Sequence, residues 1–229
     1  MSTAPSDPIR VIHFSDVLCV WAYISQVRVD ELREKLGDQV LIDVRFCSVF
    51  GDTQTKIKSA WAQKGSFSGY GAHVRDIADE YKHPSHSDIW RKLAPRSSLS
   101  SHIFLCAVRT LERRGALPMA EGSLFNQACW RVRQAFFRDL RDISDSRVQL
   151  EIADELSLPI DAITECIATG EAHAELSKDF DSAREFSVTL SPTFILNEGR
   201  QRLNGNVSFG VISANVSELL TNKSSACST

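Results

Sequence analysis

The feature that most constrains the fold is a β-α-β pattern confined to the first fifty residues of the chain. Residues 11–14 and 40–46 are short runs rich in β-branched and aromatic side chains, which is typical of buried strands. Between them, residues 21–35 carry apolar side chains near the helical period, and Gly37 follows as a candidate C-terminal cap. Because one helix with a short return joins the two strands, we expect them to be parallel.

The rest of the chain divides into a helical block and a second strand-rich segment. Residues 51–186 contain no convincing strand, and breaks rich in glycine and proline separate their helices. The amphipathic helices predicted in this block span residues 97–111, 124–137, 145–156, 161–169 and 171–186. Strand character returns at residues 193–196 and 201–203, which a hairpin turn joins, and a final helix is predicted over residues 209–220.

The order β-α-β, helical block, β-β-α predicts an α/β protein of the thioredoxin fold. A large all-helical domain is then inserted between the two halves of that fold. The predicted thioredoxin-like domain comprises residues 10–50 and 187–220, and the insert comprises residues 51–186. Residues 1–9 and 221–229 are expected to be flexible tails.

Charge and hydropathy exclude several classes of partner. The chain has 26 lysines and arginines against 29 aspartates and glutamates, a net charge of −3 that gives no reason to expect nucleic acid or anionic membranes. No apolar run approaches the roughly 20 residues of a membrane span. Residues 1–10 lack the basic region and apolar stretch of a secretory signal. We therefore expect a cytoplasmic protein that binds neither nucleic acid nor membranes.

The six cysteines are widely spaced. No two form a C-x-x-C redox or zinc pair, and the histidines show no metal-ligand spacing, so we expect no metal and no tightly bound cofactor. Cys106, Cys129 and Cys166 occupy apolar helical positions and are predicted to pack in the core. Cys227 lies in the polar tail, where we expect it to be exposed and prone to oxidation.

Three stretches carry a resemblance to a known family. Residues 15–23 read S-D-V-L-C-V-W-A-Y, which resembles the active-site turn of DsbA-like oxidoreductases, whose cytoplasmic FrnE-like branch reads S-D-x-x-C-P-W-C-Y. Ser191-Pro192, followed by T-F-I and Gly205, is similar to the cis-proline segment of that family. The runs 97–115 and 136–187 look like its inserted helices. The resemblance covers residues 10–220, and it implies thiol–disulfide chemistry and a cis peptide bond before Pro192.

Two departures change the chemistry that this resemblance implies. The second cysteine of the family motif is Ala22 here, and its proline is Val20. Because a disulfide needs two sulfurs within bonding reach, this turn cannot form one of its own. The turn also resembles that of kappa-class glutathione S-transferases and 2-hydroxychromene-2-carboxylate isomerases, which read D-V-x-S-P-[YF]-[SA] and have serine at the position of Cys19. Those relatives bind glutathione, so the resemblance implies a glutathione-linked site as readily as a protein-disulfide site.

Cys19 is the predicted catalytic residue. At the first turn of a helix, unpaired N–H groups and the helix dipole lower a thiol pKa, so we expect a thiolate at neutral pH. With a single cysteine the chemistry becomes monothiol exchange, in which glutathione or a protein thiol resolves the mixed disulfide. In an alternative, Cys19 orients a glutathione sulfur, as serine does in the kappa-class relatives. In a further alternative, catalysis is lost and Cys19 is a buried turn residue.

Four residues are predicted to bind the substrate or glutathione, as the resemblance implies. Trp21 shapes the wall of the pocket, and Ser191 presents its backbone beside Pro192 to the cysteine of a peptide or of glutathione. Asn206 lies near the position where kappa-class relatives bind the γ-glutamyl end of glutathione with a Ser-Asp pair. The local sequence Asn-Val-Ser lacks that aspartate.

Two further residues are candidates for supporting Cys19. Cys47 follows the second strand, and the loops at the carboxyl ends of parallel strands line one crevice, so Cys47 is either a resolving cysteine or a packed thiol. His102 either faces the crevice, where it stabilises a thiolate or donates a proton, or lies on the helix surface. The apolar pair Phe136-Phe137 forms either a homodimer interface or part of the core.

We therefore expect a DsbA-like thiol oxidoreductase that acts through Cys19, with glutathione as its co-substrate or a protein thiol as its partner. A kappa-class-like glutathione transferase or isomerase is the second hypothesis. The third is a catalytically inactive binding module of the thioredoxin fold. Mixed-disulfide formation at Cys19 separates the first hypothesis from the other two.

Overall fold

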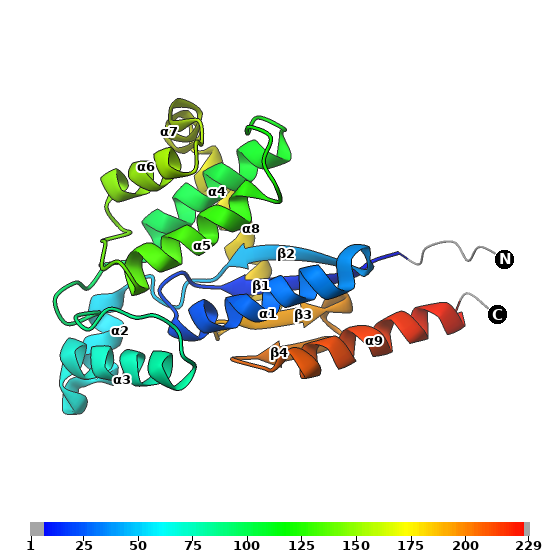
Figure 1. Cartoon of the computed structure of the whole chain (residues 1–229), viewed down its shortest axis with the longest axis horizontal. Coiled ribbons are helices and arrows are strands. Elements are labelled where there is room, and N and C mark those ends of the chain that lie inside the picture. The colour runs from blue at the N-terminus through cyan, green and yellow to red at the C-terminus, as the bar shows by residue number, and fades with distance from the viewer. Residues whose placement is uncertain (1–6, 227–229) are drawn as a thin grey trace.

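A four-stranded mixed sheet lies at the centre of the molecule (Figure 1). The computed structural model describes residues 7–226, with side chains up to residue 221. Strands β1 (Ile9–Ser15) and β2 (Val40–Phe46) pair in parallel, as predicted, while β3 (Thr193–Leu196) pairs antiparallel with both β1 and β4 (Gln201–Asn204). The strand order is β2-β1-β3-β4.

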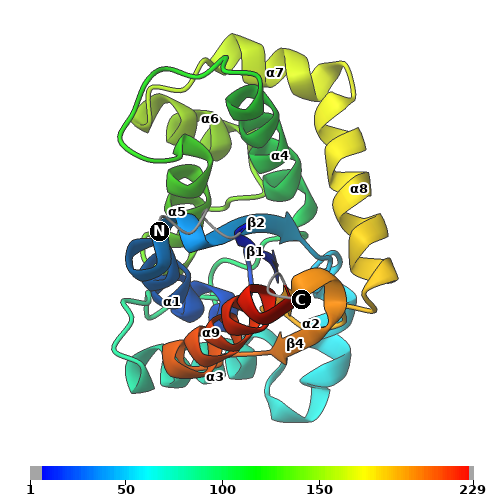
Figure 2. The same cartoon turned by 90° about the vertical axis from the view of Figure 1, so that its right-hand side faces the viewer.

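Both faces of the sheet are covered by helices. Helices α1 (Val20–Leu36) and α9 (Phe209–Ala226) pack on the face that carries Val11 and Leu196, and α8 (Glu171–Glu185) packs on the face that carries Ile12 and Ile195. Figure 2 shows α1 and α8 on opposite sides of the strands. Alternation along β1 therefore places apolar side chains in two cores.

The first helix ends where the sequence indicates. Gly37 has a φ of 47°, and its N–H donates to the carbonyl of Arg33, so the predicted glycine cap is confirmed. At the other end of the chain, α9 runs to Ala226 and not to Leu220, so it extends six residues into the predicted tail. Residues 1–6 of the other predicted tail, and Cys227, lie outside the described residues.

The residues between β2 and β3 form two groups of helices. Helices α2 (Thr53–Ala60) and α3 (Ser66–Glu80) lie near the start of α1 (Figure 1). The second group packs beside β2 and comprises α4 (Leu99–Arg113), α5 (Leu124–Phe137), α6 (Ser146–Glu155), α7 (Ile160–Ala168) and α8. The division into domains 10–50 with 187–220, and 51–186, stays a prediction.

A buried ion pair joins the second group to the sheet. The guanidinium of Arg109 lies 3.0 Å from the carboxylate of Asp179, and it also donates to the carbonyl of Val44. Asp179 in turn accepts the N–H of Phe46 at 3.0 Å. Because both charges are paired and hydrogen-bonded, this contact fixes α4 and α8 against β2.

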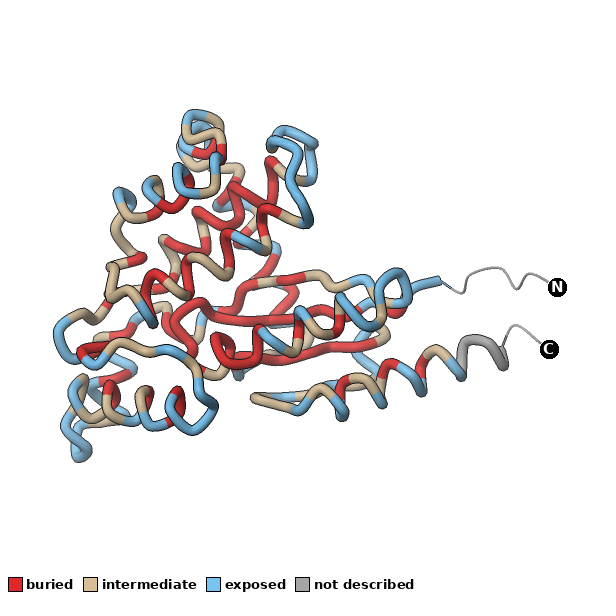
Figure 3. Tube along the Cα trace, in the orientation of Figure 1, coloured by how far each residue is buried: buried red, intermediate tan, exposed pale blue. Residues whose placement is uncertain are grey.

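The apolar pair in α5 belongs to the core. Phe136 and Phe137 are both 0% exposed, so the predicted dimer interface at this position is wrong and the core alternative is correct. Dimerisation itself stays a prediction. Cys106, Cys129 and Cys166 are buried, as predicted. Figure 3 shows that burial concentrates in β1, the first turns of α1 and the inner sides of α4 and α5.

No helix within residues 7–226 is long and apolar enough to cross a membrane.

Candidate active site

Cys19 caps the N-terminus of α1 and faces the loop before β3. Its side chain is buried, with 5% of the residue exposed. The Sγ–H group donates to the carbonyl oxygen of Ser191 at 3.1 Å, and the Ser191–Pro192 peptide bond is cis, as the resemblance implied. The geometry therefore brings three predicted site residues together, with the Cys19 thiol in its protonated, donating form.

The protonation state of Cys19 differs from the prediction. Burial raises the pKa of the thiol, and the charge of Asp16 adds to this effect. The N–H groups of Ala22 and Trp21 and the hydroxyl of Ser191 act to lower the same pKa, but burial outweighs them. The expected thiolate at neutral pH is therefore wrong for this conformation. The donors that would stabilise a thiolate are nevertheless in place at the start of the helix.

Asp16, which sequence reasoning did not single out, organises the site. It is fully buried, and its own N–H donates to the hydroxyl of Ser191 at 2.9 Å. Its carboxylate accepts hydrogen bonds at 2.8–3.0 Å from four donors: the N–H groups of Leu18, Val49 and Phe50, and the hydroxyl of Ser98. One side chain therefore ties together the Cys19 turn, the segment after β2 and the start of α4. The Ser-Asp pair of the turn motif was the signal for it.

His102 lies beneath the turn and not on the helix surface, so that alternative is wrong. The residue is fully buried, and its Nε2 accepts the N–H of Val17 at 3.2 Å. Burial lowers the pKa of His102 to about 4, so the ring is neutral at pH 7. Because Nε2 is an acceptor, the proton is assigned to Nδ1, for which the described part of the chain offers no partner. His102 supports the backbone of the turn, and it lacks the charge that would stabilise a thiolate directly.

A buried arginine lies on the other side of the turn. Arg133 of α5 donates to the Ser15 hydroxyl at 2.9 Å and to the Gln26 side chain at 2.7 Å. Among the described residues no carboxylate lies within 4 Å of it, and Asp16 and Cys19 interact with its charge at longer range. The cation therefore balances the buried charge of Asp16. An arginine among the apolar positions of α5 was the only sequence signal.

The thiol of Cys47 also interacts with the hydroxyl of Ser191. Cys47 follows β2 directly, it is buried, and its N–H donates to the carbonyl of Ser15 at 3.2 Å. Burial raises the pKa of Cys47 well above the ordinary range, the charge of Cys19 raises it further, and the hydroxyl of Ser191 lowers it. The two thiols therefore interact electrostatically, and both are free. The resolving role of Cys47 stays a hypothesis.

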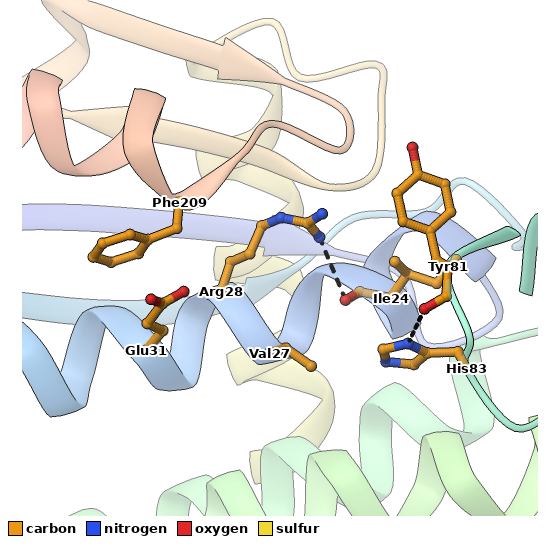
Figure 4. A pocket seen from close by; sticks show the side chains of 7 residues that line it. All are labelled: Ile24, Val27, Arg28, Glu31, Tyr81, His83 and Phe209. Carbon is orange, nitrogen blue, oxygen red and sulfur yellow. Dashed lines mark hydrogen bonds between the residues drawn. The ribbon is translucent and has the colours of Figure 1, made fainter.

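Trp21 contacts Tyr81, which lines an open groove along α1. The half-buried indole packs edge-on against Tyr81, with 5.8 Å between ring centroids. Beyond Tyr81, a groove of about 300 Å³ runs along α1 to Phe209 at the start of α9 (Figure 4). Arg28 and Glu31 of α1 line it. The groove therefore presents the cation of Arg28 and the carboxylate of Glu31, which is paired with Lys35. Trp21 is not among the residues that line it, and its predicted role in the pocket wall stays a hypothesis.

Asn206 does not line this groove. It lies in the loop between β4 and α9, and its side-chain oxygen is buried without a partner among the described residues. Nearby, the guanidinium of Arg202 donates to the carbonyls of Phe186 and Ser187 at the end of α8. The predicted glutathione-binding role of Asn206 stays a hypothesis.

The described residues contain no group of three or more His, Cys, Asp or Glu side chains that could hold a metal ion.

Comparisons with known proteins agree with this fold. The family model described as "DSBA-like thioredoxin domain" matches residues 10–216 of the chain. No curated protein matches the sequence significantly. Among solved structures, a candidate protein disulfide isomerase from Nitrosomonas europaea is 13% identical, with a TM-score of 0.72, and the match covers 94% of this chain and 98% of that chain.

Two further structures are similar at low sequence identity. A 2-hydroxychromene-2-carboxylate isomerase is 14% identical, with a TM-score of 0.63 and coverage of 95% of this chain and 98% of that one. The cytosolic disulfide reductase DsbM from Pseudomonas aeruginosa, solved with GSH, is 19% identical, with a TM-score of 0.62 and coverage of 93% and 98%. At these identities the likeness shows the fold alone, which is the predicted thioredoxin fold with inserted helices.

Proposed function

The chain belongs to the family of DSBA-like thioredoxin domains, and from this premise we propose that it is a thiol–disulfide oxidoreductase that works through the single thiol of Cys19. The observation that carries the proposal is the hydrogen bond of 3.1 Å from the Cys19 thiol to the carbonyl of Ser191, beside Pro192. The side chain of Ala22, three residues later, offers no second sulfur. The exchange is therefore a monothiol reaction.

The reaction proceeds in two steps that balance. The Cys19 thiol loses its proton to solvent, and the thiolate attacks one sulfur of a substrate disulfide. A bond forms between Cys19 and that sulfur, the substrate disulfide breaks, and the released thiolate takes up a proton. A second thiol then attacks the mixed disulfide and restores Cys19. Over these two steps one external thiol takes the place of one half of the substrate disulfide. A second external thiol then attacks the disulfide between the first thiol and the substrate and releases the second substrate thiol, so the two external thiols supply two electrons and end as their own disulfide.

The site can support this chemistry although the thiol of Cys19 is protonated before a substrate binds. When a substrate or water enters, the burial that raises the pKa of Cys19 is relieved. The N–H groups of Ala22 and Trp21 then remain to stabilise the thiolate. We therefore expect substrate entry to activate Cys19.

Glutathione is the proposed second thiol, and the groove offers one unpaired cation for it. Arg28 has no carboxylate partner among the described residues, so it is available for a glutathione carboxylate, whereas Glu31 is already paired with Lys35. The similar DsbM structure was solved with GSH. We also propose a cytoplasmic location, because five cysteines are described and all are free thiols, as a reducing compartment would keep them.

A second candidate function is a glutathione transferase or isomerase. The observation that favours it is the protonated state of Cys19, because a buried thiol that donates a hydrogen bond can replace the serine hydroxyl of such enzymes. In that case Cys19 would orient the glutathione sulfur and form no bond to it.

The test is incubation with oxidised glutathione, followed by peptide mass spectrometry, with Cys19→Ser as the matched control. We expect a glutathione adduct on the Cys19 peptide that reduced glutathione removes, and no adduct at that position in the variant. Binding of reduced glutathione without any adduct would instead support the transferase or isomerase. Neither binding nor an adduct would leave an inactive binding module.

A further inference from the structure

Arg133 is a buried cation on the inserted helix α5. The residue is 1% exposed, and its Nε has no partner among the described residues. Both terminal nitrogens of the guanidinium donate hydrogen bonds, at 2.9 Å and 2.7 Å, to oxygen atoms of other elements. Because a buried cation is costly unless it is well hydrogen-bonded, these two contacts are what keeps the charge in place.

The two hydrogen bonds bracket the active-site turn. One acceptor is the hydroxyl of Ser15, the last residue of β1, and the other is the side-chain oxygen of Gln26, in the second turn of α1. Cys19 lies between these two residues in the sequence. One guanidinium therefore joins the strand before the turn to the helix after it, which the planar fork of an arginine allows.

A chain of polar contacts continues from Arg133 along α1. Gln26 donates to the carboxylate of Asp30 at 3.0 Å, and the same carboxylate oxygen pairs with Arg33 at 3.0 Å. Arg33 in turn donates to the side-chain oxygen of Asn126, which lies on α5, at 3.0 Å. The inserted helix is therefore bonded to α1 near both of its ends, and Arg133 makes the contact nearer the active-site turn.

The charge of Arg133 also acts on the turn. Burial lowers the pKa of this guanidinium, while the charges of Cys129, Cys19 and Asp16 raise it. The group stays protonated, since an arginine side chain is not deprotonated in proteins. A fixed cation favours the charged form of a nearby acid, so it favours the Cys19 thiolate over the thiol. The titratable groups of other elements that interact with Arg133 are His13 of β1, Asp30 of α1 and His102 of α4.

We propose that Arg133 is a positioning residue of the active site, which holds the end of β1 and the start of α1 in the arrangement that Cys19 needs. The proposal deepens the proposed function and rests on it, because positioning matters only if Cys19 reacts. Arg133 acts through its two acceptors and transfers no proton. The N–H groups of Trp21 and Ala22 act on Cys19 from the first turn of α1, so the placement of that helix decides how well they stabilise the thiolate.

The test measures the rate at which iodoacetamide alkylates Cys19, followed on the Cys19 peptide at several pH values from 7 to 9. It compares the natural protein with Arg133→Met, whose side chain is long but has neither donors nor charge. We expect the rate to fall about 10-fold at each pH, because the thiolate loses a fixed cation and well-placed donors. If Arg133 only filled space, its replacement would loosen the turn, expose the buried thiol and raise the rate.

A conservative variant and a matched control sharpen this test. Arg133→Lys keeps the cation, but one ammonium group lacks the planar fork that reaches both acceptors, so we expect a smaller fall of about 3-fold. The control is Arg33→Met, which removes a cation that also has two partners, Asp30 and Asn126, at the far end of α1. We expect the alkylation rate of Cys19 to be unchanged in that variant.

Three results would overturn the proposal. These are an unchanged or faster rate in Arg133→Met, an unchanged or faster rate in Arg133→Lys, and an equal fall in Arg33→Met. The Arg133→Lys rate decides the question if Arg133→Met does not fold. Because alkylation needs no disulfide substrate, all of these rates are measured even if oxidised glutathione forms no adduct with Cys19. Absence of the adduct would overturn the proposed function alone.

Discussion

Cys19 and Cys47 both interact with Ser191, and they differ less in burial than in the donors around them. Both are almost completely buried, burial raises the pKa of both thiols, and the hydroxyl of Ser191 lowers both. Only the Cys19 side begins a helix, so only that thiol also meets backbone N–H groups, from Trp21 and Ala22. On the Cys47 side, the charges of Asp16 and Cys19 raise the pKa further.

Burial alone therefore does not distinguish a reactive thiol from a packing thiol. What separates the two sides is the set of donors that remains when the burial is relieved. The N–H groups of Val49 and Phe50, which follow Cys47, already donate to Asp16. The free donors are therefore concentrated at the start of α1.

The largest expected effect is on stability, and it comes from replacing Asp16. Its carboxylate accepts hydrogen bonds both from the Cys19 turn and from the segment after Cys47. Asp16→Asn replaces one carboxylate oxygen with an N–H₂ group, which then faces donors such as the Ser98 hydroxyl. Because a buried charge network is broken, we expect the free energy of unfolding to fall by about 4 kcal/mol. The measurement is urea denaturation followed by circular dichroism.

The graded control for this prediction is Ser98→Ala, which removes one of the four donors to Asp16 and is expected to cost about 1 kcal/mol. Equal losses in the two variants would contradict the shared role of the carboxylate. That result would leave the Cys19 and Cys47 sides held by separate contacts.

Most of the order of elements was predictable because those elements have local signals, but the helices α2 and α3, before residue 97, were not predicted individually. The strand at residues 40–46 and the helix at residues 124–137 have the predicted bounds, since apolar periodicity and turn residues fix both. The position of Cys19 before the first helix and the cis bond at Pro192 followed from the motif resemblance.

The electrostatics of the site were not predictable, because they depend on residues that only the fold brings together. The donors to Asp16 come from positions as distant as Phe50 and Ser98. The helix terminus correctly predicted donors to Cys19, but the sequence alone does not reveal how deeply the thiol is buried. His102 became a neutral acceptor for the same reason, since its burial arises from packing against Phe46.

The dependence of stability on pH also separates the two cysteines because, of the segments that carry the two thiols, only the turn that leads to Cys19 is hydrogen-bonded to a histidine within residues 7–226. Burial lowers the pKa of His102 to about 4 in the folded protein, against about 6.5 in the unfolded chain. Above pH 6.5 both states are neutral and the full stability is present. As the pH falls from 6.5 towards 4, the unfolded state takes up the proton first, and stability decreases by on the order of 3 kcal/mol.

His102→Gln separates this effect from other titrations. The amide oxygen of glutamine can accept the N–H of Val17 without titrating, so we expect a flatter stability curve between pH 6.5 and pH 4. His13, which is also buried and has a pKa lowered to about 3, keeps its own share of the acid sensitivity in both proteins. Unfolding curves at several pH values check this. If the free energy of unfolding falls equally in the two proteins between pH 6.5 and pH 4, protonation of His102 does not cause the loss of stability.

The smallest expected effect comes from replacing Ser191, whose hydroxyl interacts with both thiols. Ser191→Ala removes the hydroxyl that lowers the pKa of Cys19 and of Cys47, and it takes the acceptor from the N–H of Asp16. A hydrogen bond is worth about 1 kcal/mol, so we expect both thiols to be alkylated about 5-fold more slowly at a fixed pH. Peptide mass spectrometry of the two cysteines in one sample gives both rates. If only Cys19 is alkylated more slowly, the hydroxyl of Ser191 stabilises only the Cys19 thiolate. The reactivities of the two thiols would then depend on different donors, although both thiols are buried.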